Sequence, residues 1–177
     1  MRVLTSFFLC LSLVACQNKF ISEMNNDLDS LEAEMTEVEA KLSKLNPDTM
    51  RSLLDSIDFD MDYLELYLDE DTLSRNIAIM VGSYSDQTRN MEKWIKAFKD
   101  HSIDLDYSKA QLKSLREDVN NGLVPIELFN EYKPSEAKAI SSLKESSSSI
   151  VVWYDSNLRR YEYLKFKVDS IVGKQVQ

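Results

Sequence analysis

The segment ISEMNNDLDSLEAEMTEVEAKLSKL, residues 21–45, decides the fold class. Its apolar residues are spaced alternately three and four positions apart. They are Ile21, Met24, Leu28, Leu31, Met35, Val38, Leu42 and Leu45. This spacing places one apolar stripe along a helix and is typical of the seam between helices that pack as in a coiled coil. The segment therefore predicts a helix that buries one face.

The same alternation of three and four recurs along the rest of the chain and marks four further helices. The predicted seam residues are Met50, Leu54, Ile57, Met61, Leu64 and Leu68 in residues 47–69; Ile77, Val81, Tyr84, Thr88, Met91, Ile95 and Phe98 in residues 72–99; Leu105, Leu112, Leu115 and Val119 in a shorter fourth helix; and Ile140, Leu143, Ser147, Ile150, Tyr154, Asn157, Tyr161, Leu164, Val168 and Ile171 in residues 134–172. The chain has only three glycines and no convincing run of alternating polar and apolar residues, which argues against β-strands. We therefore expect an all-α fold, an elongated antiparallel helical bundle with coiled-coil-like heptad seams.

Residues with strong positional preferences predict where these helices begin and end. Asn46 precedes Pro47, the arrangement of a capping side chain before a proline in the first helical turn. Ser108 opens a Ser-Lys-Ala-Gln run that resembles a capping box, and Gly122 suits the left-handed residue that closes a helix. With a short connecting helix at 126–132, the prediction is five main helices and one short one.

An apolar run, residues 3–15, precedes this helical region. A membrane-spanning helix needs about 20 residues, so the run is too short to span a bilayer. One basic residue, Arg2, then an apolar stretch and a small residue form the order of features in a secretory signal peptide. Residues 13–16 at the end of this region, Leu13-Val14-Ala15-Cys16, resemble the lipobox of bacterial lipoproteins.

The resemblance implies a lipid anchor on Cys16. In that family the signal peptide, here residues 1–15, is removed, and the cysteine receives a diacylglycerol and usually an acyl chain on its new amino terminus. Residues 16–20 would then be the lipidated cysteine and a short tether, and residues 21–177 a single helical bundle domain. Where the enterobacterial sorting rule applies, Gln17 points to the outer rather than the inner membrane. The alternative is an ordinary secretory signal that happens to end near a cysteine.

The composition is acidic, with 21 bases against 30 acids and a formal net charge of −9. An acidic surface argues against nucleic acid as a partner, because phosphates attract a basic face. It also argues against electrostatic binding to anionic lipid. The lipid on Cys16 is therefore the predicted attachment to the membrane.

The charge is unevenly distributed along the sequence. Residues 17–71 carry 16 acids and 4 bases, whereas residues 72–177 carry 14 acids and 16 bases. Bases gather in the second half of the last predicted helix, at Arg159, Arg160, Lys165 and Lys167. Our hypothesis is that the acidic hairpin of the first two helices packs within the same chain against helix 72–99 and the last helix. In a parallel dimer of the first helix, acidic side chains would face each other, so we expect a monomeric bundle.

The run DFDMDYLELYLD, residues 58–69, places acidic residues at ligand positions of an EF-hand loop. Tyr63, however, occupies the position where that loop needs glycine, and the apolar residues keep helical phase throughout. We expect an acidic helix face, with loose binding of divalent cations as an open alternative. His101, the only histidine, is expected to be an exposed residue at the end of the third helix. The sequence holds no motif for catalysis, metal or cofactor binding, so none of these is predicted.

Aromatic residues gather in the carboxyl-terminal third of the chain. Trp153, Tyr163 and Phe166 lie off the predicted seam and form a candidate contact patch, because Trp and Tyr are typical interface anchors. The alternative is that this helix is flanked on two sides and buries a wide stripe. The expected function is that of a membrane-anchored, non-enzymatic interaction or scaffold lipoprotein of the bacterial cell envelope, with an unknown protein partner. A binding module that holds a small apolar or envelope-derived ligand between its helices is the alternative.

Overall fold

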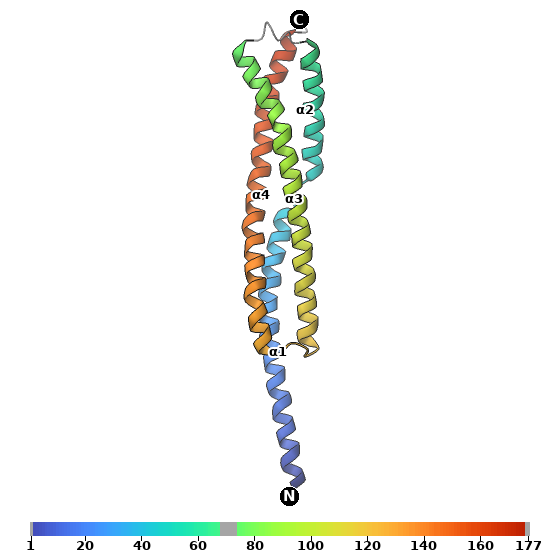
Figure 1. Ribbon diagram of the computed structural model, residues 1–177, viewed down its shortest axis with the longest axis vertical. Coiled ribbons are helices and arrows are strands. Elements are labelled where there is room, and N and C mark those ends of the chain that lie inside the picture. Colours follow the sequence, from blue (N-terminus) through green and yellow to red (C-terminus); the bar gives the residue numbers. More distant parts are fainter. Residues whose placement is uncertain (1, 68–73, 176–177) are drawn as a thin grey trace. The chain divides into compact units, whose positions relative to one another are not determined.

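The computed structural model describes the backbone of residues 2–67 and 74–175 and the side chains of residues 19–66 and 74–171. Four helices form in these residues: α1 (Arg2–Leu42), α2 (Pro47–Tyr67), α3 (Arg75–Asn120) and α4 (Ile126–Gln175) (Figure 1). All regular secondary structure in the described ranges is helical, which confirms the all-α prediction. The predicted five main helices and short connecting helix are replaced there by these four.

The helix α3 joins the predicted third and fourth helices into one. His101 and Ser108 lie inside it, and each residue is only 6% exposed. The exposed position expected for His101 and the capping box expected at Ser108 are therefore wrong. Both residues occupy core positions of a heptad that continues along α3. Because these core positions hold polar side chains, the apolar pattern appears interrupted although the helix is continuous.

The helix α4 joins the predicted connecting helix to the last helix, with Pro134 inside it. A proline inside a helix removes one backbone N–H and leaves a carbonyl of the preceding turn without its usual partner. Pro134 lies on the exposed side of α4, where water can hydrate that carbonyl. The exposed position accounts for a helix that continues past a proline.

Two predicted helix ends are confirmed. The side chain of Asn46 accepts a hydrogen bond from the backbone N–H of Asp48 (2.9 Å) and so caps the start of α2. Gly122 closes α3 with φ of 67°, in the left-handed region that glycine adopts without strain. The N–H of Leu123 then donates to the carbonyl of Asp118 (2.9 Å), the bond that closes a helix in this way.

The chain divides into two compact units. Unit 1 comprises Met1–Ala40 and Ile103–Ser146, and unit 2 comprises Lys41–Ser102 and Ser147–Gln177. The helices α3 and α4 contribute residues to both units, whereas α1 lies mainly in unit 1 and α2 lies in unit 2. Each unit therefore contains three packed helical segments.

In unit 1, side-chain contacts establish how the three segments run. Arg116 of α3 binds Asp29 of α1, and Lys109 binds Glu39, so residue numbers fall on α3 as they rise on α1. These two helices are antiparallel. Lys133 of α4 binds Asp27 of α1, and the later Lys144 binds Glu34 and Glu37, so α1 and α4 run parallel.

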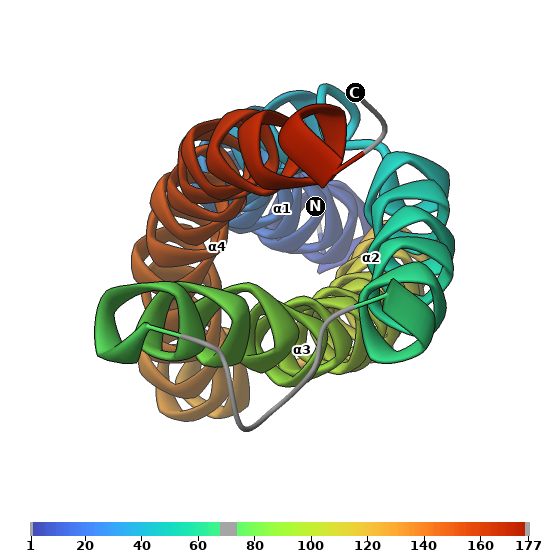
Figure 2. The same ribbon diagram turned by 90° about the horizontal axis from the view of Figure 1, so that it is seen from above.

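Unit 2 has the same arrangement, with α2 in place of α1. On α2, Ser56 contacts Tyr161 of α4 and Asp60 contacts the later Lys165, so these helices run parallel. The α3–α4 contacts of unit 2 run antiparallel, because Trp94 lies near Ile150 whereas the earlier Tyr84 lies near Tyr161. Figure 2 shows α2, α3 and α4 side by side around the core of this unit.

The predicted apolar seams of the first two helices are largely confirmed by burial, with Ile21, Leu54 and Met61 only half-buried. In residues 21–66 the buried seam residues are Met24, Leu28, Leu31, Met35, Val38, Leu42, Leu45, Met50, Ile57 and Leu64. The predicted seam of α3 is partly wrong. Gln87 and Trp94 are fully buried, whereas Thr88 and Ile95 are only half-buried. Tyr84 and Met91 are fully buried as predicted, so the true seam of α3 differs from the predicted one where Gln87 and Trp94 replace Thr88 and Ile95.

The acidic side chains of α1 are matched by bases of the same chain. All seven from Glu23 to Glu39 form ion pairs: Glu23 with Lys19, Asp27 with Lys133, Asp29 and Glu32 with Arg116, Glu34 and Glu37 with Lys144, and Glu39 with Lys109. The hypothesis that the acidic residues pack inside the chain is confirmed for α1. Its α3 partners, however, come from the segment after residue 99, and its α4 partners precede the basic cluster at 159–167.

We expect the unlipidated Cys16→Ser chain to sediment as a monomer at micromolar concentration. The apolar face of α1 is already buried against α3 and α4, and its carboxylates are already paired. Sedimentation velocity over a hundredfold range of concentration tests this expectation. A stable dimer that dissociates only after deletion of residues 21–45 would contradict it.

Candidate functional site

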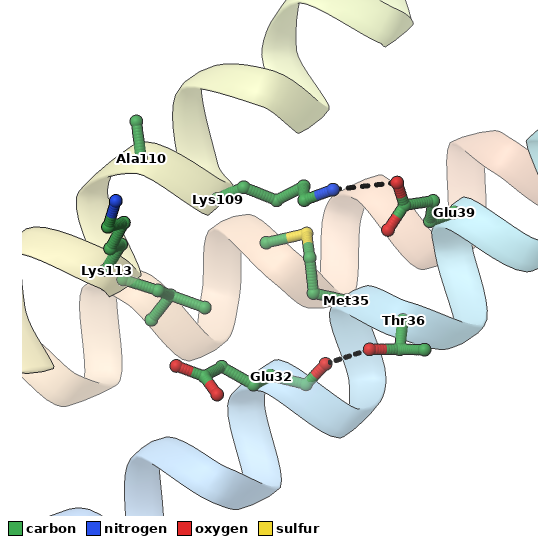
Figure 3. A pocket seen from close by; sticks show the side chains of 8 residues that line it. Glu32, Met35, Thr36, Glu39, Lys109, Ala110 and Lys113 are labelled. Atoms are coloured by element: carbon green, nitrogen blue, oxygen red, sulfur yellow. Dashed lines mark hydrogen bonds and ion pairs between the residues drawn. The ribbon is translucent and has the colours of Figure 1, made fainter.

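A shallow groove lies between α1 and α3 in unit 1, with a volume of about 370 Å³. Figure 3 shows Met35 at its floor and Lys109 reaching across it to Glu39, with Nζ and Oε1 2.7 Å apart. Thr36 and Ala110 leave the space because their side chains are small. The ion pair closes over an apolar floor, and both charged groups are already satisfied. This groove offers little to a charged ligand.

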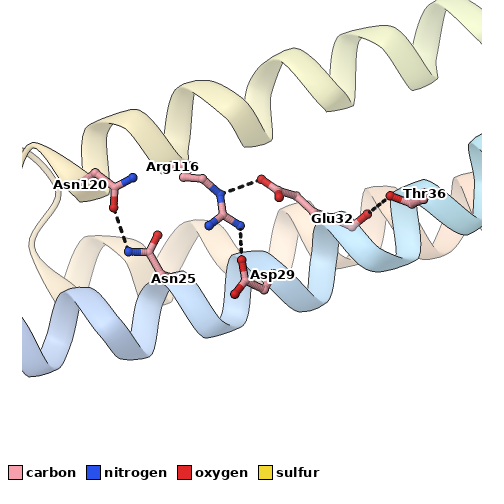
Figure 4. Close-up of polar contacts among 6 residues, drawn as sticks. All are labelled: Asn25, Asp29, Glu32, Thr36, Arg116 and Asn120. Atoms are coloured by element: carbon pink, nitrogen blue, oxygen red, sulfur yellow. Dashed lines mark hydrogen bonds and ion pairs between the residues drawn. The ribbon is translucent and has the colours of Figure 1, made fainter.

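Beside this groove, Arg116 joins α3 to two carboxylates of α1 (Figure 4). Its Nε lies 2.8 Å from Glu32 and its second guanidinium nitrogen lies 2.7 Å from Asp29. The hydrogen bond to Glu32, with a smaller contribution from Asp29, raises the pKa of Arg116. Asn25 and Asn120 add a 2.8 Å hydrogen bond between the same helices. These contacts set the register of α1 against α3, and we assign them a structural role.

Unit 2 contains a polar cluster where α2, α3 and α4 meet. The hydroxyl of Tyr84, whose side chain is fully buried, donates to Asp60 at 2.5 Å. Lys165 lies 3.3 Å from Asp60 and also binds Asp169. Burial, followed by the hydrogen bond and charge of Asp60, raises the pKa of Tyr84 well above its usual 10.0. For Lys165, burial lowers the pKa, but the hydrogen bonds and charges of Asp169 and Asp60 outweigh burial and raise it.

This cluster predicts alkaline destabilisation that depends on Tyr84. In the unfolded chain a tyrosine loses its proton near pH 10.0, whereas folded Tyr84 keeps it. The unfolded state then binds fewer protons, so the free energy of unfolding falls as pH rises above that value. Tyr84→Phe should weaken the pH dependence between about pH 9 and 11 and lower stability at neutral pH by about 1 kcal/mol. Lys165 acts in the same direction, so part of the dependence should remain.

Denaturant unfolding at several pH values measures this effect. The matched control is Tyr163→Phe, because Tyr163 is 63% exposed and its ring contacts Lys167 rather than a carboxylate. An equal change of slope in both variants would contradict the assignment to Tyr84.

A second groove lies between α3 and α4 of unit 2, with a volume of about 490 Å³. We call it the α3–α4 groove. Its lining residues are Asp86, Gln87, Arg89, Asn90 and Lys93 of α3 and Trp153, Ser156, Asn157 and Arg160 of α4. Eight of these nine side chains are polar or charged, so the groove is suited to a polar rather than an apolar ligand.

Two amide side chains at this groove lack hydrogen-bond partners within the described part of the chain. Gln87 is 0% exposed, and neither its Oε1 nor its Nε2 has a partner. Asn157 is 4% exposed, and its Nδ2 is likewise unpaired. Buried polar atoms are nearly always hydrogen-bonded, and leaving one without a partner costs about 1–3 kcal/mol. These amides are therefore positioned to bind water or a ligand that enters the groove.

The groove is also electropositive. Arg89, Lys93 and Arg160 line it together with one acid, Asp86, a net charge of +2. Among the residues that the structure describes, none of the three bases forms an ion pair. They differ in this respect from the bases that contact α1, each of which holds a carboxylate. The unpaired positive charge marks the α3–α4 groove as the candidate functional site.

The structure places the three predicted patch residues differently. Trp153 is half-buried and lines the α3–α4 groove, whereas Tyr163 and Phe166 are 63% and 70% exposed and do not line it. Of the residues that line the groove, the sequence placed Trp153 in the predicted patch and Arg160 in the basic cluster, but it did not predict that they share a groove. Asn157 was expected on the seam, but Gln87 on the facing helix carried no sequence signal, because burial of a polar residue is set by the neighbouring helix.

The other expected features are located as follows. Cys16 lies in α1, but its side chain lies outside the described residues. The acidic run that begins at Asp58 is helical as far as Tyr67, as expected for a helix face, and Asp69 lies outside the described residues. Among the described side chains, no three His, Cys, Asp or Glu residues lie close enough to hold a metal ion. In the same part of the chain no helix has the length and apolar character needed to cross a membrane.

Comparison with known proteins leaves these features to be interpreted on their own. No family model, curated protein or solved structure matches the chain.

Proposed function

We propose that this protein is a lipid-anchored, non-enzymatic interaction protein of the bacterial cell envelope. The anchor is the lipid on Cys16, which the Leu13-Val14-Ala15-Cys16 sequence implies. The interaction surface is the α3–α4 groove, and the observation that carries the proposal is its set of unpaired bases and buried, unpaired amides. Such groups recognise a polar partner, and no reaction needs to follow from binding.

The alternative, a module that holds a small apolar ligand between its helices, has less support. The two grooves are open at the surface, and the interior of each unit is filled by large side chains such as Leu28 in unit 1 and Trp94 in unit 2. An apolar ligand would leave the bases of the groove without a counter-charge and the amides of Gln87 and Asn157 without hydrogen-bond partners. A polar partner satisfies both groups.

Crosslinking in native cells followed by mass spectrometry tests the proposal. A photoreactive residue at Ser156, at the edge of the groove, should capture one predominant protein. The control position is Ser170, which lies on an exposed part of the same helix and outside the groove. Equal and diffuse labelling from both positions would contradict a specific interaction role.

A further inference from the structure

We propose that the α3–α4 groove binds a short, extended acidic segment of a partner protein. This inference rests on the proposed interaction role and names both the surface and the chemistry of the partner. Its support comes from the length of the groove, its charge and the hydrogen-bonding needs of its two amides.

The groove has the dimensions of a short peptide. Its lining residues extend from Asp86 to Lys93 on α3 and from Trp153 to Arg160 on α4. Seven helical steps cover about 10 Å at 1.5 Å per residue. An extended chain advances roughly 3.3 Å per residue, so about three residues match this length. The volume of about 490 Å³ falls within the range of known ligand sites.

The charge of the groove favours an acidic occupant. Its three bases face a single acid, and none of them is neutralised by the described part of the chain. Arg89 and Arg160 carry planar guanidinium groups, which bind carboxylates through paired hydrogen bonds. Two or three carboxylates from Asp or Glu side chains would complement the net charge of +2.

The amides distinguish a peptide from a simple anion. Gln87 presents an unpaired acceptor, Oε1, as well as unpaired N–H donors, and Asn157 adds another unpaired donor group. An inorganic anion without a proton, such as sulfate, only accepts hydrogen bonds, so it would leave Oε1 of Gln87 unsatisfied. A peptide backbone offers both N–H and C=O groups. The segment must be extended, because a helix uses these groups internally.

Fluorescence anisotropy with the full chain in detergent tests the inference. The probes are labelled tetrapeptides of alternating Asp and Glu, of Asn and Gln, and of Lys. The acidic peptide should bind saturably, and the other two should not. Charge reversal at two of the three groove bases, Lys93→Glu with Arg160→Glu, should weaken binding about tenfold or more, since each lost charge-assisted bond is worth a large factor. The matched control, Lys96→Glu with Arg159→Glu, makes the same charge change on the same helices but outside the groove.

The amides need a separate variant, because charge reversal does not test them. Gln87→Met and Asn157→Leu keep nearly the same side-chain size and remove the polar atoms. We expect the double variant to bind the acidic peptide about fivefold more weakly or worse, with a melting temperature that is unchanged or higher. A merely structural role would produce the opposite pattern, a lower melting temperature with unchanged binding, and would overturn the inference.

Three other results would also overturn it. The first is absence of saturable binding by the acidic peptide, and the second is equal loss of binding in the groove and control charge reversals. The third is competition by inorganic phosphate at the same concentration as the peptide, which would identify a simple anion site. Self-association of the chain through Lys93 and Arg160 would overturn it as well, because the occupant would then be the acidic face of the helix α2 in a second copy and not an extended segment. Retained crosslinking from Ser156 in a chain that binds no acidic peptide would reject this inference but leave the proposed function standing.

Discussion

Replacing Trp94 with alanine is expected to lower the free energy of unfolding by about 3–5 kcal/mol. Its side chain is fully buried in unit 2, where its ring centroid lies 5.2 Å from that of Phe98 and 5.0 Å from that of Tyr154. The indole N–H also donates to the backbone carbonyl of Ile150 on α4 at 3.0 Å. Alanine would leave a large cavity between α3 and α4 and remove that hydrogen bond.

The chain offers a matched control for this substitution in its other tryptophan. Trp153 is only half-buried and lines an open groove, so Trp153→Ala should cost much less stability. Trp94→Phe keeps a ring in the core and removes the donor, and it should fall between the two. Guanidinium unfolding followed by far-ultraviolet circular dichroism measures all three. Equal losses for the two alanine variants would show that Trp94 is not the central packing residue of unit 2.

Under the lipoprotein proposal, Cys16→Ser is expected to abolish membrane attachment. Without the sulfur no diacylglycerol can be added, and the chain should accumulate as an uncleaved precursor or as unanchored protein. Burial of each methylene contributes about 0.8 kcal/mol, so loss of two or three acyl chains removes more binding energy than any polar contact could replace.

Cell fractionation and metabolic labelling with a palmitate analogue measure this outcome. The control is Cys10→Ser, because Cys10 lies within the segment that the proposal removes, and this variant should be processed and labelled normally. Recovery of the Cys16→Ser chain as a processed and fully membrane-bound protein would reject the lipid anchor.

The periodic spacing of apolar residues was sufficient to predict the helical class and the buried face of α1. Apolar residues spaced alternately three and four apart fall on one face only if the segment is helical, and that face must be buried. It was insufficient for α3. There the core positions include Gln87, His101 and Ser108. Ile95 is apolar but only half-buried, so the sequence pattern selected it in place of its buried neighbour Trp94. The two helices predicted for this region are therefore one, since polar core residues look like a break when neighbouring helices are unknown.

The sequence similarly predicted that acidic residues of α1 pair with bases of the same chain, but it did not predict which bases these are. The excess of acid in the first part of the chain correctly favoured pairing within the molecule. The bases that satisfy α1 are spread singly through the sequence, as with Lys109 and Arg116. Of the cluster near the end of α4, only Lys165 pairs with α2 among the residues that the structure describes. The α3–α4 groove could not be predicted either, because its lining comes from two helices whose packing the sequence does not specify.

The parallel alignment of α1 with α4 has a consequence for the order in which the chain folds. Parallel neighbours cannot be joined by a short turn, and Lys41 and Ser148, which contact each other, are 107 residues apart in sequence. During synthesis α1 is complete long before either of its neighbours exists, so its packing depends on closing a long loop late in folding. Until then its apolar stripe is exposed. We expect the seven carboxylates from Glu23 to Glu39 to keep the unpacked helix soluble and to repel other nascent copies, before the ion pairs with α3 and α4 can form.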